Sequence, residues 1–192
     1  MRVSKKRFIY LISPNKIYDK FYKDLRDVLS TRKVSFFQLR LKRYSLKDKI
    51  LVGKKIKLIC KNYNVKFLIN DDPYLAKKLN ADGCHLGQKD KSIGEARKII
   101  GDKIIGITCH NSIKLAKAAI NEKASYVAFG AFFSTKTKNI KYRAKIKILN
   151  KAKKLTKTPL VAIGGINNNN YKKLLLNNAN LLAISGYVWN NK

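Results

Sequence analysis

Eight strand-like runs alternate with segments of helical spacing along this chain, and this alternation restricts the fold more than any other feature. The strands are expected at 7–13, 35–42, 65–70, 83–87, 103–109, 125–130, 159–164 and 181–188. Several of these runs are almost continuously apolar, which is typical of strands buried on both faces of a parallel sheet. Helical spacing occurs between them at 46–60, 73–79, 92–100, 112–121, 144–155 and 171–178. The pattern therefore predicts repeated βαβ units.

Eight such units predict an α/β fold, the closed (β/α)8 TIM barrel, with residues 1–192 forming a single domain. An open, doubly wound sheet is the alternative, but the regular repeats and the lack of a GxGxxG motif favour closure. Because Lys192 follows soon after the last strand, we expect the eighth helix to be missing or very short. A homo-oligomer interface is one way to cover the exposed side of the first and last strands.

The charge is strongly positive, with 43 Lys+Arg, 11 Asp+Glu and a formal net charge of +32. Such a charge is typical of nucleic-acid-binding proteins. Here the lysines are spread along the whole chain, and no zinc finger, RNP motif or basic tail is present, so we expect no specific nucleic-acid partner. The same field attracts small phosphorylated substrates. No apolar run approaches the roughly 18 residues of a membrane-spanning helix, so we expect no membrane partner.

The three cysteines are widely spaced and form no CxxC motif, which predicts no disulfide framework and a cytoplasmic location. Two of them precede a histidine, in Cys84–His85 and Cys109–His110. Neither pair has the spacing of a zinc site, so buried cysteines and hydrogen-bonded histidines are the simpler interpretation. His110, at a strand end, stays a candidate for ligand contact or acid–base chemistry.

Four of the few acidic residues gather between positions 71 and 90: Asp71, Asp72, Asp82 and Asp90. Asp71 and Asp90 follow neighbouring strands and are candidate ligands of Mg²⁺, which takes one or two carboxylates and fills its other positions with water and phosphate. Asp72 precedes Pro73 and is expected to cap a helix. For Asp82 we expect a structural role.

The segment 38–42 alternates polar and apolar residues. In a strand, this period of two places Gln38, Arg40 and Lys42 on one face, inside the barrel. Two cations facing inward need an anion: Arg40 can bind phosphate bidentately, and Lys42 acts as a point charge.

A second anion site is predicted where the later strands end. Hydroxyls and cations alternate in 134–138, Gly164–Gly165 follows the seventh strand, and Ser185–Gly186 lies at the end of the eighth. Loops after strands seven and eight often bind phosphate in barrels, through accessible backbone N–H groups. The two sites suit two phosphorylated substrates, or one substrate phosphorylated at both ends. A diphosphate leaving group would fit the metal side.

These stretches also carry a family resemblance that covers nearly the whole chain. The matching segments are 10–14, 38–42, 69–71, 81–90, 106–112, 126–138, 161–166 and 183–186, and Asn-Asp, HisLeuGlyGln-x-Asp and Thr-x-Thr-Lys are specific as a set. In them the chain resembles the thiamine-phosphate synthase family. It departs from the family pattern at Thr108, where many members have Ser, at Ser134, which replaces a common Pro, and in its short C-terminus.

The resemblance implies a transferase that joins hydroxymethylpyrimidine diphosphate to hydroxyethylthiazole phosphate through a pyrimidine cation, with Mg²⁺ as cofactor. Asp71 and Asp90 would hold the metal. The implied diphosphate contacts, of which Arg40, Lys42 and Lys138 would be catalytic, are Arg40, Lys42, Asn70 and Lys138. Those to the pyrimidine are Gln38 and Thr108, and those near the thiazole phosphate are Thr135, Thr137, Gly165, Ile184 and Ser185.

Two other functions stay open beside this one. A thiazole tautomerase of the same superfamily would need a proton-transfer group, for which His110 is the candidate, and no diphosphate site. A member that binds thiamine precursors without turnover is the second.

Overall fold

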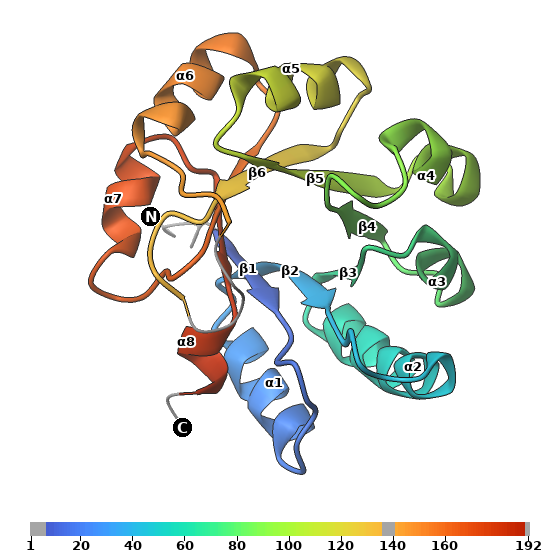
Figure 1. Ribbon diagram of the computed structural model, residues 1–192. Helices are drawn as coiled ribbons and strands as arrows, with labels where there is room; N and C mark the ends of the chain where they lie inside the picture. Colours follow the sequence, from blue (N-terminus) through green and yellow to red (C-terminus); the bar gives the residue numbers. More distant parts are fainter. Residues whose placement is uncertain (1–6, 136–140, 191–192) are drawn as a thin grey trace, which may run out of the picture.

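A closed ring of eight parallel strands forms the centre of the computed structural model, which describes residues 7–135 and 141–190 (Figure 1). The strands are β1 (Ile9–Ile12), β2 (Val34–Leu39), β3 (Lys66–Asn70), β4 (Gly83–Leu86), β5 (Ile104–His110), β6 (Tyr126–Gly130), β7 (Leu160–Ile163) and β8 (Leu181–Ile184). Each strand pairs with the next, and β8 pairs with β1. The predicted (β/α)8 barrel is confirmed.

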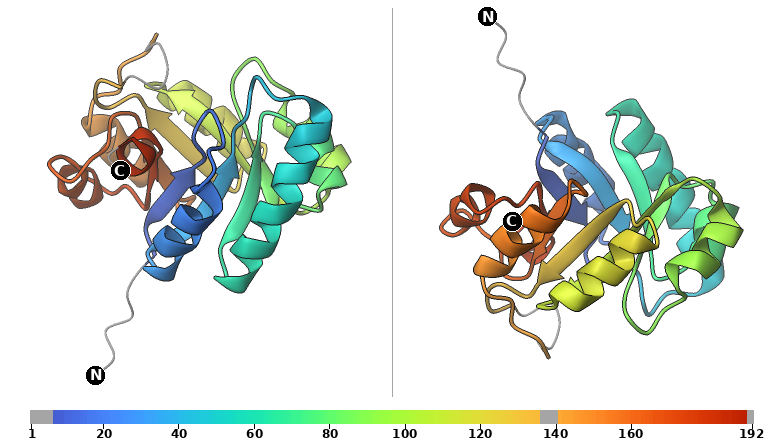
Figure 2. Two further views of the ribbon diagram at one scale, coloured as in Figure 1. Left: turned by 90° about the horizontal axis from the view of Figure 1, so that it is seen from below. Right: turned by 90° about the horizontal axis from the view of Figure 1, so that it is seen from above.

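A helix follows every strand in the part of the chain that the structure describes. The helices are α1 (Phe21–Ser30), α2 (Leu46–Asn62), α3 (Pro73–Lys78), α4 (Ile93–Ile100), α5 (Ile113–Asn121), α6 (Lys147–Leu155), α7 (Tyr171–Leu176) and α8 (Gly186–Trp189). The side views show α1 and α2 lying alongside the first strands (Figure 2). Several helices begin at a side-chain cap that the sequence supplies, such as Ser45 before α2, Ser112 before α5 and a Ser92–Glu95 capping box before α4.

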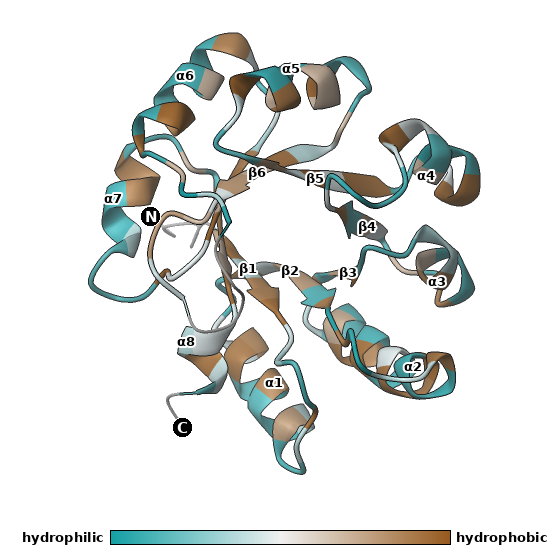
Figure 3. Ribbon diagram, in the orientation of Figure 1, coloured by the Kyte–Doolittle hydropathy of each residue, from teal (hydrophilic) through white to brown (hydrophobic). Residues whose placement is uncertain are grey.

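The barrel has two apolar layers. The larger lies between the strands and the helices, where residues such as Phe37, Phe67 and Leu149 are fully buried. The smaller fills the barrel interior and includes Leu68 and Val161. The strands are accordingly mostly hydrophobic in Figure 3, whereas the helices alternate between hydrophilic and hydrophobic residues. The interior is thus filled with side chains, and a ligand can reach it only from the rim.

The eighth helix is a single turn, as expected, and its last residue, Trp189, is buried against the barrel. The Trp189 ring lies 5.3 Å from the Phe21 ring of α1 and is buried. Its Nε1 donates a hydrogen bond of 2.7 Å to the carbonyl oxygen of Ile12. Trp189 therefore ties α8 to the first strand, while the homo-oligomer stays a prediction.

Replacing Trp189 with alanine should lower the free energy of unfolding by about 3–5 kcal/mol, since a large buried ring and a buried hydrogen bond are both lost. Urea denaturation followed by circular dichroism measures this change. Leu176→Ala is the control, because Leu176 is 84% exposed and its truncation should alter stability by no more than about 0.5 kcal/mol. A loss below about 1 kcal/mol for Trp189→Ala would contradict the role of Trp189 in tying α8 to the barrel.

Two strands end at least three residues earlier than the sequence pattern indicates. The run 35–42 was expected to be one strand, but β2 ends at Leu39, and the chain then turns toward α2. The run 181–188 ends as a strand at Ile184, because α8 begins at Gly186. In both cases apolar residues continue past the strand, since Leu41 and Trp189 pack into the outer layer. The hydrophobic pattern therefore extends further than the strand itself.

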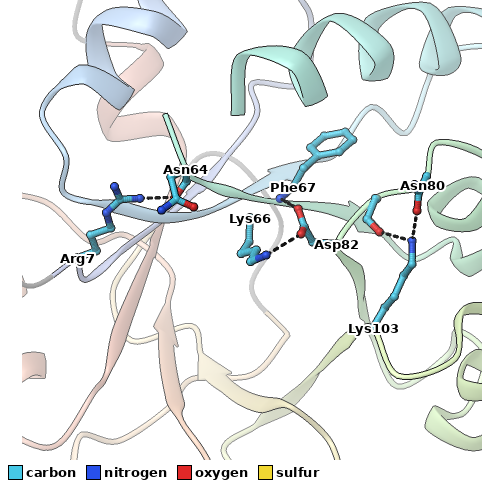
Figure 4. A network of polar contacts seen from close by, with 8 residues as sticks. Arg7, Asn64, Lys66, Phe67, Asn80, Asp82 and Lys103 are labelled. Atoms are coloured by element: carbon cyan, nitrogen blue, oxygen red, sulfur yellow. Dashed lines mark hydrogen bonds and ion pairs between the residues drawn. The ribbon is translucent and has the colours of Figure 1, made fainter. Parts of the chain in front are cut away.

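Asp82 has the structural role expected from the sequence. It lies before β4, where its carboxylate accepts the backbone N–H of Phe67 at 2.8 Å and pairs with Lys66 at 3.0 Å (Figure 4). Lys103 makes comparable contacts nearby, to Asn80 at 2.5 Å and to a backbone carbonyl. This network joins the starts of β3, β4 and β5, at the end of the barrel opposite the candidate site. No helix within residues 7–135 and 141–190 is long and apolar enough to cross a membrane.

Candidate active site

Most of the predicted site residues lie where the strands end, at the carboxyl rim of the barrel. Those from β2 to β4 are Arg40, Lys42, Asn70, Asp71 and Asp90, and those from β6 to β8 are Thr135, Gly165, Ile184 and Ser185. Thr137 and Lys138 lie outside the described residues. The rim is where barrel enzymes place their catalytic groups, and the described residues of the two predicted sites lie on its two sides.

Asp71 is held in place by its backbone as well as by an ion pair. It follows the last residue of β3 in the left-handed region, with φ 64°, a conformation that Asp tolerates better than most residues. Its backbone N–H donates to the carbonyl oxygen of His85 at 2.8 Å. Its carboxylate pairs with the Lys42 ammonium at 2.9 Å. Burial raises the pKa of Asp71, but hydrogen bonds with Lys42 and Asp90, together with the charges of Lys42 and His85, hold that pKa below its usual value.

Asp90 forms the second half of an acidic pair with Asp71. Its carboxylate accepts the backbone N–H of Gly87 at 2.6 Å, which fixes it at the end of the loop after β4. Burial raises its pKa, and although the Gly87 bond opposes the change, a hydrogen bond and the charge of Asp71 raise it further. Two carboxylates this close repel each other unless a proton or a cation lies between them.

Arg40 and Lys42 lie at the rim, and this corrects the expectation of an inward row along a strand. Only Gln38 of the three lies on β2 and inside the barrel. Arg40 follows the strand, where its backbone N–H donates to Ser13 Oγ at 2.9 Å and its guanidinium donates to Asn15 Oδ1 at 3.0 Å. Lys42 is exposed, and both cations lie at the mouth of the barrel.

Asn70 and Asp71 border a hollow of about 250 Å³ between the β2 and β3 loops. Its lining includes Lys42, Asn70 and Asp71, together with Lys49 and Asp72. Asp72 caps α3 by accepting the N–H of Leu75 at 2.9 Å, as expected. A larger hollow of about 660 Å³ lies between α1 and α2 and shares no residue with the rim. The smaller hollow is therefore the one lined by predicted site residues.

The opposite side of the rim is built from loops that cross closely. Gly164 and Gly165 have φ of 104° and 63°, and the Phe133 N–H donates to the carbonyl oxygen of Gly164 at 3.0 Å. An added Cβ on Gly165 would lie 2.2 Å from the carbonyl oxygen of Ser134. Ser185 Oγ donates to the Ser13 carbonyl at 3.1 Å. Glycine is needed here because the two loops leave no room for a side chain.

Gln38 and Thr108 lie at the two ends of a hydrogen-bonded chain inside the barrel. Gln38 Nε2 donates to the Tyr10 hydroxyl at 2.7 Å, and Thr108 Oγ1 lies 2.8 Å from His85 Nε2. Tyr126 joins the middle of the chain. Sequence reasoning missed both tyrosines, because a tyrosine on a barrel strand reads as an ordinary core residue. The predicted hydrogen-bonded role of His85 is confirmed, and the thiols of Cys84 and Cys109 are free and buried.

His110 ends β5 in a left-handed conformation, with φ 52°. Its ring lies 4.2 Å from the Tyr142 ring, at a tilt of 32°. Among the described residues, no group of three or more His, Cys, Asp or Glu side chains is placed to hold a metal. A metal at Asp71 and Asp90 would therefore take its other ligands from water and substrate, which suits Mg²⁺ and not a structural zinc site.

Comparison with known proteins decides the family. The model of the family described as thiamine monophosphate synthase matches residues 9–188. The chain belongs to this family. It is 67% identical to the thiamine-phosphate synthase of Pelagibacter ubique (strain HTCC1062), over 97% of this chain and 91% of that one. The corresponding protein of Erythrobacter litoralis (strain HTCC2594) is 40% identical, over 94% and 87%.

The solved structure of thiamine phosphate pyrophosphorylase from Pyrococcus furiosus has the same fold. It superposes with a TM-score of 0.82 at 27% identity, covering 95% of this chain and 87% of that one. The predicted family and the predicted class of enzyme, a transferase of thiamine biosynthesis, are confirmed.

Proposed function

We propose that this thiamine-phosphate synthase joins hydroxymethylpyrimidine diphosphate to hydroxyethylthiazole phosphate, releasing diphosphate, with Mg²⁺ held by Asp71 and Asp90. The observation that carries the proposal is the cluster of Lys42, Asp71 and Asp90 at the rim, where Arg40 also lies after β2. This cluster combines a metal-binding pair with cations suited to phosphate oxygens. Such groups stabilise the charge that develops on a departing diphosphate.

The acidic pair fits a divalent cation. Each carboxylate affects the pKa of the other, and Asp90 is the one whose pKa is raised. The single positive charge of Lys42 pairs with Asp71. A dication bound between the two carboxylates would compensate the negative charge of both, so they would not need to share a proton. Bound there, Mg²⁺ would neutralise negative charge on the diphosphate oxygens.

The chemistry proceeds by two bond changes. The bond between the pyrimidine methylene carbon and the diphosphate oxygen breaks, and its electron pair leaves with diphosphate. Arg40 and Lys42 contact the developing negative charge, and Lys138, outside the described residues, is proposed to join them. The ring nitrogen of the thiazole then donates its electron pair to the methylene cation, which forms the new C–N bond.

Separate contacts position the two reacting halves. We assign the pyrimidine to Gln38 and Thr108, which lie below the rim inside the barrel. Asn70 contacts the diphosphate. The thiazole phosphate is assigned to the loops after β6, β7 and β8, through Thr135, Thr137, Gly165, Ile184 and Ser185. Holding both halves in one mouth makes the C–N bond formation effectively intramolecular.

Phosphorus NMR of the purified protein with Mg²⁺ tests this reaction. Free diphosphate should accumulate rapidly only when both the pyrimidine diphosphate and the thiazole phosphate are present. Isomerisation of a thiazole phosphate without diphosphate release would favour the tautomerase, with His110 as its proton-transfer group. Binding of both halves without any turnover would favour a precursor-binding protein.

A further inference from the structure

Five side chains from five strands form a continuous hydrogen-bonded chain across the inside of the barrel. Gln38 Nε2 lies 2.7 Å from the Tyr10 hydroxyl, which lies 2.8 Å from the Tyr126 hydroxyl. The Tyr126 hydroxyl lies 2.9 Å from His85 Nδ1, and His85 Nε2 lies 2.8 Å from Thr108 Oγ1. The two ends of the chain are the residues assigned to the pyrimidine, whereas its middle has no assigned function.

Packing holds the middle of the chain rigidly. The Tyr10 and Tyr126 rings meet edge to face, with 5.7 Å between their centres, and the His85 ring stacks on Tyr126 at 5.6 Å. The Phe36 ring packs against both tyrosines. Tyr10, Tyr126 and His85 are buried, so each depends on its neighbours for hydrogen bonds. Burial also raises the pKa of both phenols, which therefore keep their protons.

The hydrogen bonds between these five side chains all run in one direction, because each phenol has only one proton to donate. The Gln38 amide nitrogen donates to Tyr10, so Tyr10 gives its own proton to Tyr126. Tyr126 then donates to Nδ1 of His85, whose proton must lie on Nε2 and point at Thr108. Reversing every one of these hydrogen bonds requires the Gln38 amide to flip, so that its oxygen faces Tyr10. Reversing only some of them leaves a buried proton without an acceptor.

This direction determines what the two ends offer a ligand. With its nitrogen bound to Tyr10, the Gln38 amide keeps its oxygen as an acceptor. Because the Thr108 oxygen accepts from His85, its hydroxyl proton is left to donate. An aminopyrimidine matches this pair, since its exocyclic amino group donates and its ring nitrogens accept.

We propose that Tyr10, Tyr126 and His85 are positioning residues that hold Gln38 as an acceptor and Thr108 as a donor toward the aminopyrimidine. This inference rests on the proposed function, since it takes the pyrimidine to bind at Gln38 and Thr108. It assigns to the three buried residues the selection of the pyrimidine half, without contact with the reacting atoms.

The histidine tautomer in the full-length wild-type protein tests the direction of the chain. The sequence contains two histidines, so a ¹⁵N-labelled sample gives two ring systems, and His110→Gln identifies which is His85. We expect the His85 ring proton on Nε2, facing Thr108, with Nδ1 as the acceptor for Tyr126. A proton on Nδ1, or on both nitrogens, would overturn the proposal. This spectrum needs no substrate and no activity.

Kinetics test the effect on the pyrimidine half. Tyr10→Phe leaves the Gln38 amide nitrogen unpaired, and should raise the KM for pyrimidine diphosphate about tenfold or more. The KM for thiazole phosphate should change by less than about twofold, because that site lies across the rim. Tyr22→Phe on α1, outside the barrel, is the matched control. Equal changes in both KM values would indicate a general structural role and contradict the inference.

The tautomer measurement and the activity measurement together separate this inference from the proposed function. A wild-type protein that forms product but carries His85 with the proton on Nδ1 would refute the chain and leave the synthase intact. A wild-type protein without any synthase activity would refute the proposed function, whatever the tautomer.

Discussion

Asp90→Ala should lower kcat/KM for thiamine phosphate formation by about a thousandfold or more, the upper range for losing one stabiliser of developing charge. The variant leaves Asp71 as the sole carboxylate of the pair, already engaged by Lys42 at 2.9 Å. The diphosphate would then leave with less compensation of its charge. Steady-state kinetics with saturating Mg²⁺ measures the loss.

The fold should tolerate this substitution. Asp90 is exposed, and its loss also removes repulsion from Asp71, so the free energy of unfolding should change by no more than about 1 kcal/mol. Asp27→Ala is the matched control, because it removes one exposed carboxylate from α1 and changes the net charge equally. An Asp90→Ala protein that keeps more than about a tenth of the activity would refute the assignment of the metal ligand.

Gly165→Ala should raise the KM for thiazole phosphate about a hundredfold, the cost of displacing a positioned substrate by roughly 1 Å. At φ 63° an alanine is strained, and its Cβ would lie 2.2 Å from the Ser134 carbonyl oxygen and 2.8 Å from the Phe133 carbonyl carbon. The loop after β6 must therefore move away from the loop after β7. Initial rates at varied thiazole phosphate concentration measure the effect.

Gly94→Ala gives the control for this change. Gly94 lies in α4, and a Cβ added there meets nothing within 4 Å. Alanine is favoured over glycine inside a helix by roughly 0.5–1 kcal/mol, so this variant should be as stable as the wild type or slightly more stable. Both of its KM values should match the wild type. If Gly165→Ala also left the thiazole phosphate KM unchanged, the second phosphate site would be placed wrongly.

The barrel and its caps could be predicted because they depend on local patterns. Apolar runs mark the strands, and the Asp72–Pro73 pair marks the start of α3 through a cap that the structure contains. The early end of β2 was not predictable, since Leu39 and Leu41 both pack outward and continue the alternation after strand pairing has stopped. Alternation reports which side a residue faces, not whether it is paired in the sheet.

The acidic pair could be predicted from the sequence, but the buried hydrogen-bonded side chains inside the barrel could not. Asp71 and Asp90 stand out in a chain with few acidic residues and follow neighbouring strands, so their proximity follows from the fold. Tyr10 and Tyr126 are 116 residues apart and meet only when the barrel closes and sets the register of its strands. Their alignment with His85 depends on that closure.

Formation of thiamine phosphate from the two purified halves is the most direct test of the proposed reaction. Thiamine phosphate is measured as its fluorescent oxidation product in reactions that contain Mg²⁺, that contain EDTA, or that lack one of the two halves. We predict product only when both halves and Mg²⁺ are present, one diphosphate for each thiamine phosphate, and none after EDTA. Product that is indifferent to EDTA would contradict the metal site. No product from folded protein that still binds thiazole phosphate would contradict the synthase reaction itself.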